Sequence, residues 1–595
     1  MEKKIHPNLY RIDIFPGKKA VTADENDLLA DRIQEAGIPL SLYCGKKGLC
    51  GKCFVEIIKG KRPPVEERED FFIKQKGLNR KHRLACLFRI KSDLEIRIPE
   101  ESIIQEISIL QTGERTPVLL DPQIKKYHLQ LRKPQIALPS SFLEMVENAF
   151  QKKLRVPLAV LRKFPAIAEQ NHYQITAVMD SDDQVLDIEP GDTSKENFGI
   201  AIDAGTTTLV VELVDLVTGK TLDTLTARND QIQYGSDVMS RIGFAIKDSR
   251  NLAELKKSIL NALNGMIGQI LDKKEIDKAN VYEIVIAGNP PMNHFLLGLP
   301  VESLARAPYL SVFSCLPELT SDELGFRINE RGKVYVSPNI KSFVGGDISA
   351  GLAAVDLANK KGNFLFIDLG TNGEIVLKKQ DTFMATSTAA GPAFEGMNIS
   401  CGMLALPGAI HRVEDRDQIV IHTLGEKPAL GICGTGLIDL IAIFLERGMV
   451  SVRGRIKNKS KRIRITGNLT ITQKDIREIQ LAIAAIKSGI RMILMKNNLK
   501  LDQLDGIFIA GAFGNYLNIR NSIRIGLLPP LDDEKIHFVG NSSLAGAKAF
   551  LLSRPAREKI ESLVKTIRFF SLAADPMFQD YFIEALEFKE QSLSG

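Results

Sequence analysis

Four cysteines lie close together near the start of this 595-residue chain, at Cys44, Cys50, Cys53 and Cys86. Thiols at such spacing can bind a metal, form disulfides, act as a redox pair or fill a core. The chain has seven cysteines in all and lacks an apolar signal core at its start, so we expect it in the cytoplasm, where disulfide frameworks are rare. Four cysteines clustered near one end therefore favour a metal site.

The gaps between these cysteines narrow the choice of metal. Five residues separate the first two, two separate the next two, and 32 precede the last. A zinc ribbon usually has two C-x2-C pairs, whereas this cluster has one. Three ligands and then a distant fourth are similar to the [2Fe–2S] ferredoxins, and the long first gap resembles their adrenodoxin-like branch. We therefore predict one [2Fe–2S] cluster on all four thiolates, with zinc as a minor alternative.

The residues near the cysteines agree with this prediction. Gly45, Gly48 and Gly51 would let a loop wrap tightly and aim backbone N–H groups at the sulfurs. The other three cysteines stand in apolar or glycine-rich settings, where small buried thiols are the favoured interpretation. They are Cys315, Cys401 and Cys433.

A different chemistry is indicated further along the chain, where the string D-x-G-T occurs twice. Each copy ends one apolar strand and precedes another, at Asp203 and at Asp368. Glycine lets the backbone approach a phosphate closely, and the turn amides and hydroxyls can bind it. A carboxylate cannot bind phosphate directly, so it would hold Mg2+, usually through water, or position an attacking water.

Two further motifs repeat in the same order, which indicates a duplicated domain. An Ala-Gly pair ends a strand at Gly288 and again at Gly511, and an F-V-G stretch begins at Phe343 and again at Phe538. We expect the two halves to cover residues 198–358 and 361–552, with their two D-x-G-T turns facing each other around a nucleotide.

These motifs resemble the superfamily of actin, sugar kinases and heat-shock chaperone ATPases. The resemblance implies two ribonuclease-H-like halves that hinge over ATP and Mg2+, with Asp203 and Asp368 as the catalytic carboxylates. It implies that glycine-rich helices near Gly346 and Gly540 cross at the hinge. The residues implied to contact the nucleotide are Gly205, Thr206, Thr207, Gly370, Thr371, Asn372, Gly511 and Gly514.

The elements that must position these residues divide the chain into three domains. Residues 1–98 are predicted as strands around one helix, as in a β-grasp [2Fe–2S] ferredoxin. Residues 99–195 are predicted as linkers around a small middle domain. Residues 196–595 would form the actin-like ATPase and a C-terminal extension. The predicted fold class is thus multidomain, α+β and α/β.

The composition of the chain argues against some classes of partner. Hydrophobic residues make up 44% and charged residues 25% of the chain, and no stretch approaches the roughly 20 apolar residues of a membrane span. We expect no membrane and no nucleic-acid partner, because no basic stripe is interleaved with aromatic residues. The net charge of +6 equals the surplus of the first 100 residues, and Lys46, Lys47 and Lys52 are candidates for docking a protein partner.

The combination of a ferredoxin domain and this ATPase resembles the reductive activators of corrinoid proteins. The resemblance covers essentially the whole chain. It implies that ATP drives one low-potential electron from the [2Fe–2S] cluster to an inactive Co(II) corrinoid protein, restoring Co(I) for methyl transfer. The electron donor is unknown, and a homodimer is left open. No histidine follows an aspartate at the spacing of the D-x-H-x-x-G corrinoid signature, so the corrinoid would sit on a separate protein.

Two alternatives stay open at this stage. One is an ATP-dependent electron injector for a dehydratase or reductase, whose cluster would use cysteines of the ATPase itself, such as Cys401 or Cys433. The other is a redox-sensing kinase or chaperone-like regulator. A sugar kinase needs a catalytic aspartate in its substrate site, and the sequence does not choose among Asp347, Asp439 and Asp505.

Overall fold

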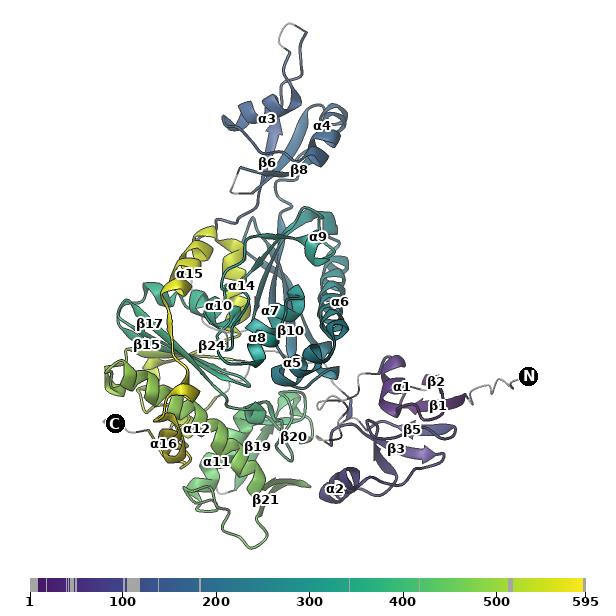
Figure 1. Ribbon diagram of the computed structural model, residues 1–595, viewed down its shortest axis with the longest axis vertical. Coiled ribbons are helices and arrows are strands. Elements are labelled where there is room, and N and C mark those ends of the chain that lie inside the picture. The colour runs from purple at the N-terminus through teal and green to yellow at the C-terminus, as the bar shows by residue number, and fades with distance from the viewer. Residues whose placement is uncertain are drawn as a thin grey trace, which may run out of the picture.

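Three bodies of secondary structure follow one another along the chain (Figure 1). The structure is a computed structural model. It describes residues 9–591 apart from 18, 39, 41, 43–45, 47, 49–50, 100–101, 104–117, 137–138, 181–182, 342, 417 and 512–516. Of the helices in these ranges, none is long and apolar enough to cross a membrane.

The N-terminal body is a five-stranded sheet in the order β2-β1-β5-β3-β4. The strand YRIDIF alternates apolar and polar residues, and its Ile12 and Ile14 are fully buried. Helix α1 (Leu29–Glu35) packs Leu29 and Ile33 into the same core. Strands β1 and β5 are parallel, and the remaining pairs are antiparallel. The strands are β1 (Tyr10–Phe15), β2 (Lys19–Ala23), β3 (Phe54–Lys59), β4 (His82–Leu84) and β5 (Leu94–Arg97), and the second helix is α2 (Glu67–Gln75).

The middle body is an antiparallel sheet, β6-β7-β8, covered by two helices. Helix α3 (Phe142–Phe150) begins with a capping box between Ser141 and Glu144, which explains where it starts. The other elements are α4 (Leu158–Gln170), β6 (Lys125–Gln130), β7 (Gln174–Met179) and β8 (Val185–Pro190).

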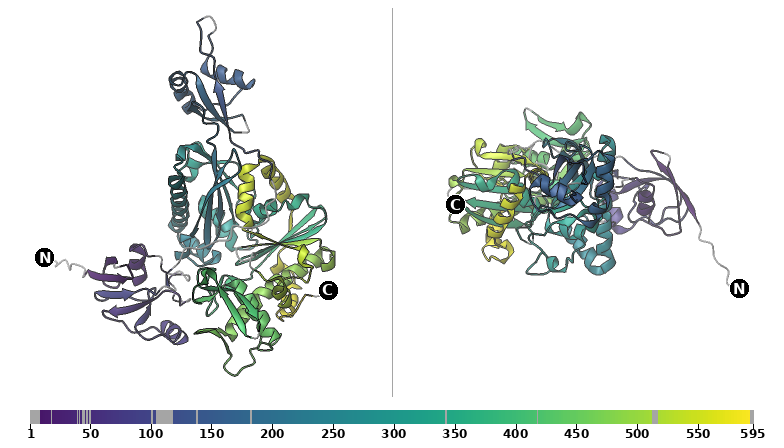
Figure 2. Two further views of the ribbon diagram at one scale, coloured as in Figure 1. Left: turned by 180° about the vertical axis from the view of Figure 1, so that it is seen from behind. Right: turned by 90° about the horizontal axis from the view of Figure 1, so that it is seen from above.

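A buried hydrogen bond and a partly buried ion pair attach this middle body to the first half of the ATPase. The Tyr282 hydroxyl donates to Glu189 at 2.6 Å, and Lys126 pairs with the same carboxylate at 2.8 Å. Arg331 pairs with Asp187 at 2.6 Å. Breaking one partner of a buried charge network is strongly destabilising, so the attachment is firm. Figures 1 and 2 place the middle body at the far end from the N-terminal body.

The C-terminal body has two halves with one topology. In the first, a meander of β9, β10 and β11 precedes the long helix α6 (Ser249–Lys274), the parallel strands β12 and β14, and the helix α10 (Gly346–Ala354). In the second, β15, β16 and β17 precede α12 (Gln473–Lys496), β23, β24 and α14 (Ser542–Leu552). This is the predicted duplicated fold. The strands are β9 (Phe198–Ala204), β10 (Thr208–Asp215), β11 (Thr221–Arg228), β12 (Val281–Gly288), β14 (Lys333–Val336), β15 (Asn363–Leu369), β16 (Gly373–Lys379), β17 (Thr382–Thr388), β23 (Gly506–Ala510) and β24 (Ile536–Gly540).

Helices α10 and α14 pack against each other between the halves. A Cβ atom on Gly546 would lie 2.0 Å from the carbonyl oxygen of Ala350, and one on Gly351 would lie 2.5 Å from the ring of Phe366. The two backbones therefore touch without intervening side chains, which is the close crossing that the glycine-rich pattern predicts.

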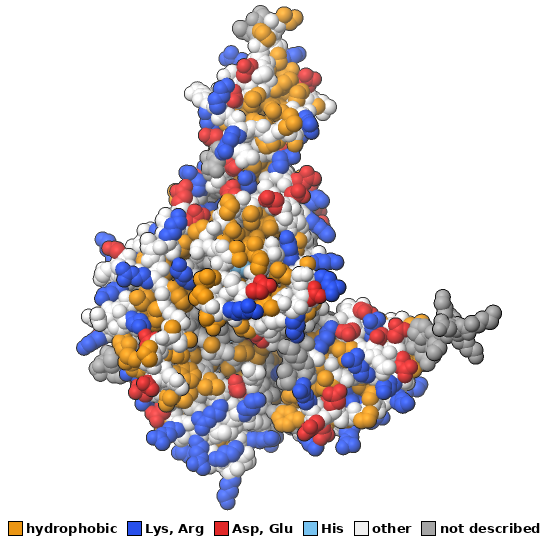
Figure 3. Space-filling model, in the orientation of Figure 1, with side chains coloured by type: hydrophobic (Ala, Val, Ile, Leu, Met, Phe, Trp, Pro, Cys, Tyr) orange, Lys and Arg blue, Asp and Glu red, His pale blue; other side chains and the backbone are white. Residues whose placement is uncertain are grey.

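The second half carries an insertion between its meander and its long helix. A small sheet, β19-β18-β20, leads to α11 (Gly434–Glu446), and the hairpin of β21 and β22 follows. Residues 450–474 contain no Asp or Glu, and Figure 3 shows Lys and Arg gathered at this lower end of the molecule. The elements are β18 (Ala409–Asp415), β19 (Ile419–Thr423), β20 (Gly431–Ile432), β21 (Arg462–Thr466) and β22 (Leu469–Thr472). The exposed cations are Arg453, Arg455, Lys457, Lys459, Arg462, Arg464 and Lys474.

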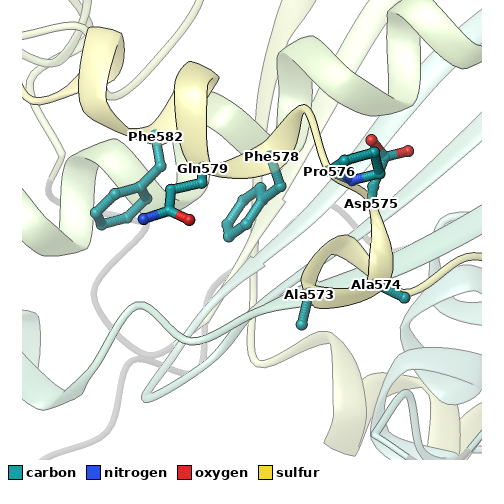
Figure 4. Close-up of a pocket in the computed structure, with 7 residues that line it drawn as sticks. All are labelled: Ala573, Ala574, Asp575, Pro576, Phe578, Gln579 and Phe582. Atoms are coloured by element: carbon teal, nitrogen blue, oxygen red, sulfur yellow. The ribbon is translucent and has the colours of Figure 1, made fainter.

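The chain ends in α15 (Arg554–Thr566) and α16 (Phe578–Ala585). A cavity of about 440 Å³ beside α16 is lined by Phe578, Phe582 and their neighbours (Figure 4). None of its lining residues belongs to the predicted nucleotide site.

Candidate functional site

The first D-x-G-T turn joins β9 to β10 and is braced by side chains from three other elements. The Asn229 side chain donates to the Gly205 carbonyl at 2.9 Å, and Arg241 donates to the Thr206 carbonyl at 2.7 Å. Asn289 donates to the Thr206 hydroxyl at 3.0 Å. Arg241 lies on α5 (Val238–Lys247) and is fully buried, and this burial lowers its pKa to about 9. The turn therefore has a fixed shape.

The carboxylate of Asp203, at the end of β9, is held from the other half. Asn541 and Ser543 each donate to it at 2.8 Å. Asn541 also accepts the Leu544 amide as the N-cap of α14. The beginning of one hinge helix thus touches the first turn directly.

The second D-x-G-T turn joins β15 to β16 and has fewer supports. The Gly370 amide donates to the Asn372 carbonyl at 3.1 Å. Among the described residues, no side chain donates a hydrogen bond to Asp368, whose pKa burial and the charges of Asp347 and Asp203 raise to about 7. The second turn is therefore the electrostatically strained one.

Glu395 joins the two turns. It ends the short helix η5 (Pro392–Glu395), and its carboxylate accepts the Thr207 hydroxyl at 3.2 Å and the Thr371 hydroxyl through its other oxygen. Burial raises its pKa. The two predicted phosphate turns thus face each other across one carboxylate.

Four carboxylates interact with one another near the two turns, those of Asp203, Asp347, Asp368 and Glu374. Burial, together with the charge of Asp203, raises the pKa of Asp347 to about 7. Burial and the charges of Asp347 and Asp368 raise the pKa of Glu374 well above its usual range. A bound cation would relieve the electrostatic repulsion among these carboxylates.

The arrangement fits magnesium held through water. No group of three or more His, Cys, Asp or Glu side chains in the described ranges is placed to ligate a metal directly. Mg2+ keeps several of its waters and needs only one or two carboxylates beside a phosphate. Asp203 and Asp368 stand on facing turns and so suit this role, which stays a prediction.

Gly511, the predicted adenosine neighbour, follows β23 in a left-handed conformation with φ of 110°. A Cβ there would lie 2.5 Å from the Leu369 carbonyl oxygen, so the residue is close to the second turn and must be glycine. Gly514, predicted beside it, lies outside the described residues.

In the N-terminal body, Cys53 and Cys86 are buried at 1% and 3% exposure, whereas Cys44 and Cys50 lie outside the described residues. Gly48 and Gly51 adopt left-handed conformations, with φ of 68° and 61°. A Cβ at Gly51 would lie 2.5 Å from the ring of Phe72, so the loop has no room for side chains at this point. Buried thiols in a tight glycine loop fit a [2Fe–2S] cluster.

A buried ion pair fixes the approach to Cys86. The guanidinium of Arg83 donates to Glu69 at 2.9 and 2.7 Å, and the Leu84 amide donates to the same carboxylate at 2.6 Å. Helix α2 therefore fixes strand β4 and the turn that follows it.

The lysines of the cysteine loop have partners within the chain. Lys52 donates to the Gly402 carbonyl at 2.6 Å, which joins the N-terminal body to the ATPase. Lys46 pairs with Asp31 of its own body. The sequence suggested both lysines for docking a partner, and the structure shows them engaged internally. Lys47 lies outside the described residues.

The cysteines of the ATPase behave as thiols. Burial, with the charge of Asp475, raises the pKa of Cys401 to about 12, and burial raises that of Cys433. The Cys433 sulfur contacts the Ile410 carbonyl oxygen at 3.4 Å. Metal ligation needs thiolates, so neither environment favours it.

Sequence reasoning missed several residues of the site. Asn541 and Ser543 lie in the second copy of the repeated F-V-G motif, so their polar side chains at the start of a hinge helix were an available signal. Asp347, in the first copy, was named only as one of three candidate kinase aspartates. Glu395 belongs to no repeated motif. The other two candidate aspartates have structural roles: Asp439 accepts the Val413 amide, and Asp505 accepts the Asn363 amide.

Four family models match consecutive parts of the chain. They are the 2Fe-2S iron-sulfur cluster binding domain at residues 13–91, the RACo linker region at 113–195, the RACo middle region at 198–360, and the C-terminal domain of RACo, the ASKHA domain, at 362–594.

Relatives also match large parts of the chain. The corrinoid activation enzyme RamQ of Eubacterium limosum is 30% identical over 595 residues, which cover 95% of this chain and 97% of that protein. The chain belongs to the family of corrinoid reductive activators. The [Co(II) methylated amine-specific corrinoid protein] reductase of Methanosarcina barkeri is 28% identical over 430 residues, covering 67% of this chain and 78% of that protein. A solved structure titled as a reductive activator for corrinoid, iron-sulfur protein has 34% identity and a TM-score of 0.74, and covers 98% of this chain and 99% of that one.

Membership in this family confirms the resemblance and the fold class predicted from the sequence. The N-terminal body is a [2Fe–2S] ferredoxin-type domain, and the C-terminal body is an ASKHA domain of the ATPase type. The domain boundaries and the roles of individual site residues stay predictions.

Proposed function

We propose that this corrinoid reductive activator uses ATP binding and hydrolysis to deliver one low-potential electron to a Co(II) corrinoid protein. Delivery would restore the Co(I) state that methyl transfer requires. The observation that carries the proposal is the contact between Lys52, beside Cys53, and Gly402, seven residues after Glu395. One chain thus connects a cluster loop to the facing turns of an ATPase.

The residues would share the work as follows. Asp203 and Asp368 would hold the waters of Mg2+ or position the attacking water. Their two turns would hold the phosphates, through Gly205, Thr206, Thr207, Gly370, Thr371 and Asn372, and Gly511 and Gly514 would border the adenosine. Cys44, Cys50, Cys53 and Cys86 would hold the [2Fe–2S] cluster, which supplies a site for one electron.

ATP can supply the required driving force. A one-electron potential changes by about 59 mV for each 1.4 kcal/mol. A coupling of about 3 kcal/mol, at the upper end of common allosteric values, would shift an acceptor by about 130 mV. Such a shift in reduction potential would allow an acceptor of otherwise too low a potential to be reduced.

The electron-injector alternative is disfavoured by the thiols of the ATPase. It needs cluster ligands there, and the environments of Cys401 and Cys433 raise their pKa values instead of lowering them. The contacts described here do not favour a kinase or chaperone-like regulator either.

The test mixes the reduced holoprotein with a Co(II) corrinoid protein under anaerobic conditions and records the cobalt absorption spectrum. We expect Co(I) to appear with Mg·ATP and not with Mg·ADP. Cys86→Ser should abolish electron transfer to the corrinoid protein while leaving nucleotide binding intact. Reduction at full rate without ATP would overturn the proposal.

A further inference from the structure

The Glu395 carboxylate occupies the place where both predicted phosphate turns converge. Thr207 and Thr371 point their hydroxyls at its two oxygens. A triphosphate held by these turns would need the same hydroxyls. Two anions a few Å apart in a poorly solvated site repel strongly. Glu395 and a γ-phosphate therefore compete for one position.

The backbone after Glu395 folds back on itself. Gly396 has φ of 76°, and a Cβ placed on it would lie 2.5 Å from the Met403 amide nitrogen. A Cβ on Gly402 would lie 2.1 Å from the Gly396 carbonyl oxygen. The two glycines are in direct backbone contact, so a shift of Gly396 is passed to Gly402 without a side chain to absorb it.

A fixed point lies between the two ends. The Ser400 amide and hydroxyl both donate to Asp475, at 2.7 and 3.0 Å, and Asp475 is fully buried at the start of α12. Residues 392–403, which we call the coupling segment, are therefore anchored at Ser400.

The far end of the coupling segment meets the ferredoxin domain. The Gly402 carbonyl accepts the ammonium of Lys52 at 2.6 Å. Lys52 immediately precedes Cys53, so this bond holds Lys52 and Cys53 beside the ATPase. Strand β20 supports the same place, because the Met403 amide donates to Ile432 at 2.9 Å.

We infer that the coupling segment transmits the state of the nucleotide site to the cysteine loop. The inference rests on the proposed function, whose ATP site it uses. Without a γ-phosphate, Glu395 bridges the turns and Lys52 keeps the ferredoxin domain docked. With a γ-phosphate, Glu395 leaves, Gly396 displaces Gly402, and the loop is released toward its acceptor. Hydrolysis and phosphate loss restore the docked state.

The test measures amide hydrogen exchange in the full-length holoprotein with Mg·ADP and with Mg2+ and a non-hydrolysable ATP analogue. The peptides to follow cover residues 396–404 and 51–56. We expect the analogue to raise exchange in both by about tenfold, equivalent to ~1.4 kcal/mol of opening free energy. Calorimetry on the same samples measures nucleotide binding.

Variants separate the two ends of the segment. Glu395→Gln should bind the analogue at least as tightly as the wild type and lose the exchange response, because a neutral amide is not repelled. Lys52→Met should exchange rapidly at 51–56 with either nucleotide, with an unchanged dissociation constant. Lys46→Met is the matched control: it removes a lysine of the same loop whose partner is Asp31, and it should respond like the wild type.

A backbone variant gives an independent check on the side-chain variants. Gly402→Ala places a methyl group against Gly396, so the docked and released states should no longer differ with nucleotide. If the wild type binds the analogue and neither peptide changes, the inference is overturned while the proposed function stands. If the protein fails to bind nucleotide, or fails to reduce a corrinoid protein, the proposed function is instead contradicted.

Discussion

The two D-x-G-T turns have the same sequence pattern and different supports. Side chains of Asn229, Arg241 and Asn289 brace the first turn, and two donors hold its Asp203. The second turn relies on Glu395 and on its own backbone, and no described side chain donates to Asp368. The first turn is thus formed in advance, whereas we expect the second to be completed by a bound ligand.

This difference indicates that the two turns took on different roles after the domain was duplicated. A braced turn can bind phosphate without rearrangement, which lowers the entropic cost of binding. A turn whose carboxylate has a pKa of about 7 gains most from a cation, because Mg2+ removes the repulsion that raises that pKa. We therefore expect the second half to be the part of the site that responds to the nucleotide.

The largest expected effect separates the two carboxylates. Asp203→Asn and Asp368→Asn should each lower ATP hydrolysis by about 10²–10³-fold, the usual loss when a preorganised electrostatic group is removed. Their effects on folding should be opposite. Asp203→Asn loses a hydrogen-bond acceptor and should destabilise the protein by about 1–2 kcal/mol, whereas Asp368→Asn removes a repelled charge and should stabilise it at pH 8.

Urea unfolding without nucleotide measures these stability changes, and a phosphate-release assay measures hydrolysis. If both variants change stability in the same direction, the two turns are equivalent and the comparison fails.

The next effect concerns the brace of the first turn. Arg241→Ala leaves the carbonyls of Thr206 and Gly235 without their donor and opens a cavity, so it should destabilise the protein by about 2–4 kcal/mol. Ser387→Ala, which removes only a 3.3 Å bond to Glu374 beside the second turn, should cost less than about 1 kcal/mol. Equal unfolding midpoints for the two variants would contradict this ranking.

A smaller effect is the pH dependence of stability. The pKa values of Asp347 and Asp368 are raised from 3.8 to about 7 in the folded protein. Between these values the folded state holds protons that the unfolded state has lost, so both groups make stability fall as the pH rises through this range. Above pH 7 that loss is complete.

Unfolding midpoints at pH 5.5 and 7.5 measure this slope. Asp368→Asn should flatten it, and so should Mg2+ with nucleotide, which would release protons on binding. Glu283, whose pKa burial also raises to about 7, pairs with Arg557 away from the site and should contribute equally in both proteins. A slope that Asp368→Asn leaves unchanged would show that its pKa is ordinary.

The smallest effect lies in the insertion that belongs to the second half. Changing Lys459, Arg462 and Arg464 of the basic hairpin to Gln should slow association with an acidic protein partner a few-fold at low salt, with little change at high salt. Hydrolysis without partner should not change. The matched control changes Lys257, Lys274 and Lys278, exposed on the first half. An equal loss in the control would mean that only total charge matters.

The sequence predicted the features that depend on local pattern. Cysteine spacing, apolar strands ending in Asp-x-Gly-Thr, and small residues in two helices each determine what forms within a few residues. Gly511 was predicted for the same reason, since a glycine after a buried strand marks a tight backbone approach. The order of elements in the two halves followed from the repeated motifs.

The sequence could not reveal contacts between distant segments. Glu395 meets Thr207 across 188 positions, and Lys52 meets Gly402 across 350. No local pattern records such pairs. For the same reason the sequence made Lys52 a candidate for docking a partner, whereas in the folded chain it donates a hydrogen bond to the Gly402 carbonyl. The raised pKa of Asp347 likewise depends on its burial and on the charge of Asp203, which lies on β9.

The contacts that attach the middle domain to the ATPase bear on how that domain moves. Tyr282 and Arg331, both from the first half, contact Glu189 and Asp187, and the Asp121 carbonyl accepts the Arg554 amide just after α14 of the second half. The body of the domain protrudes at one end of the molecule (Figure 1). We therefore expect a small rotation at the crossing of α10 and α14 to be magnified at its outer tip. A dye attached there would report each opening of the ATPase as a large displacement.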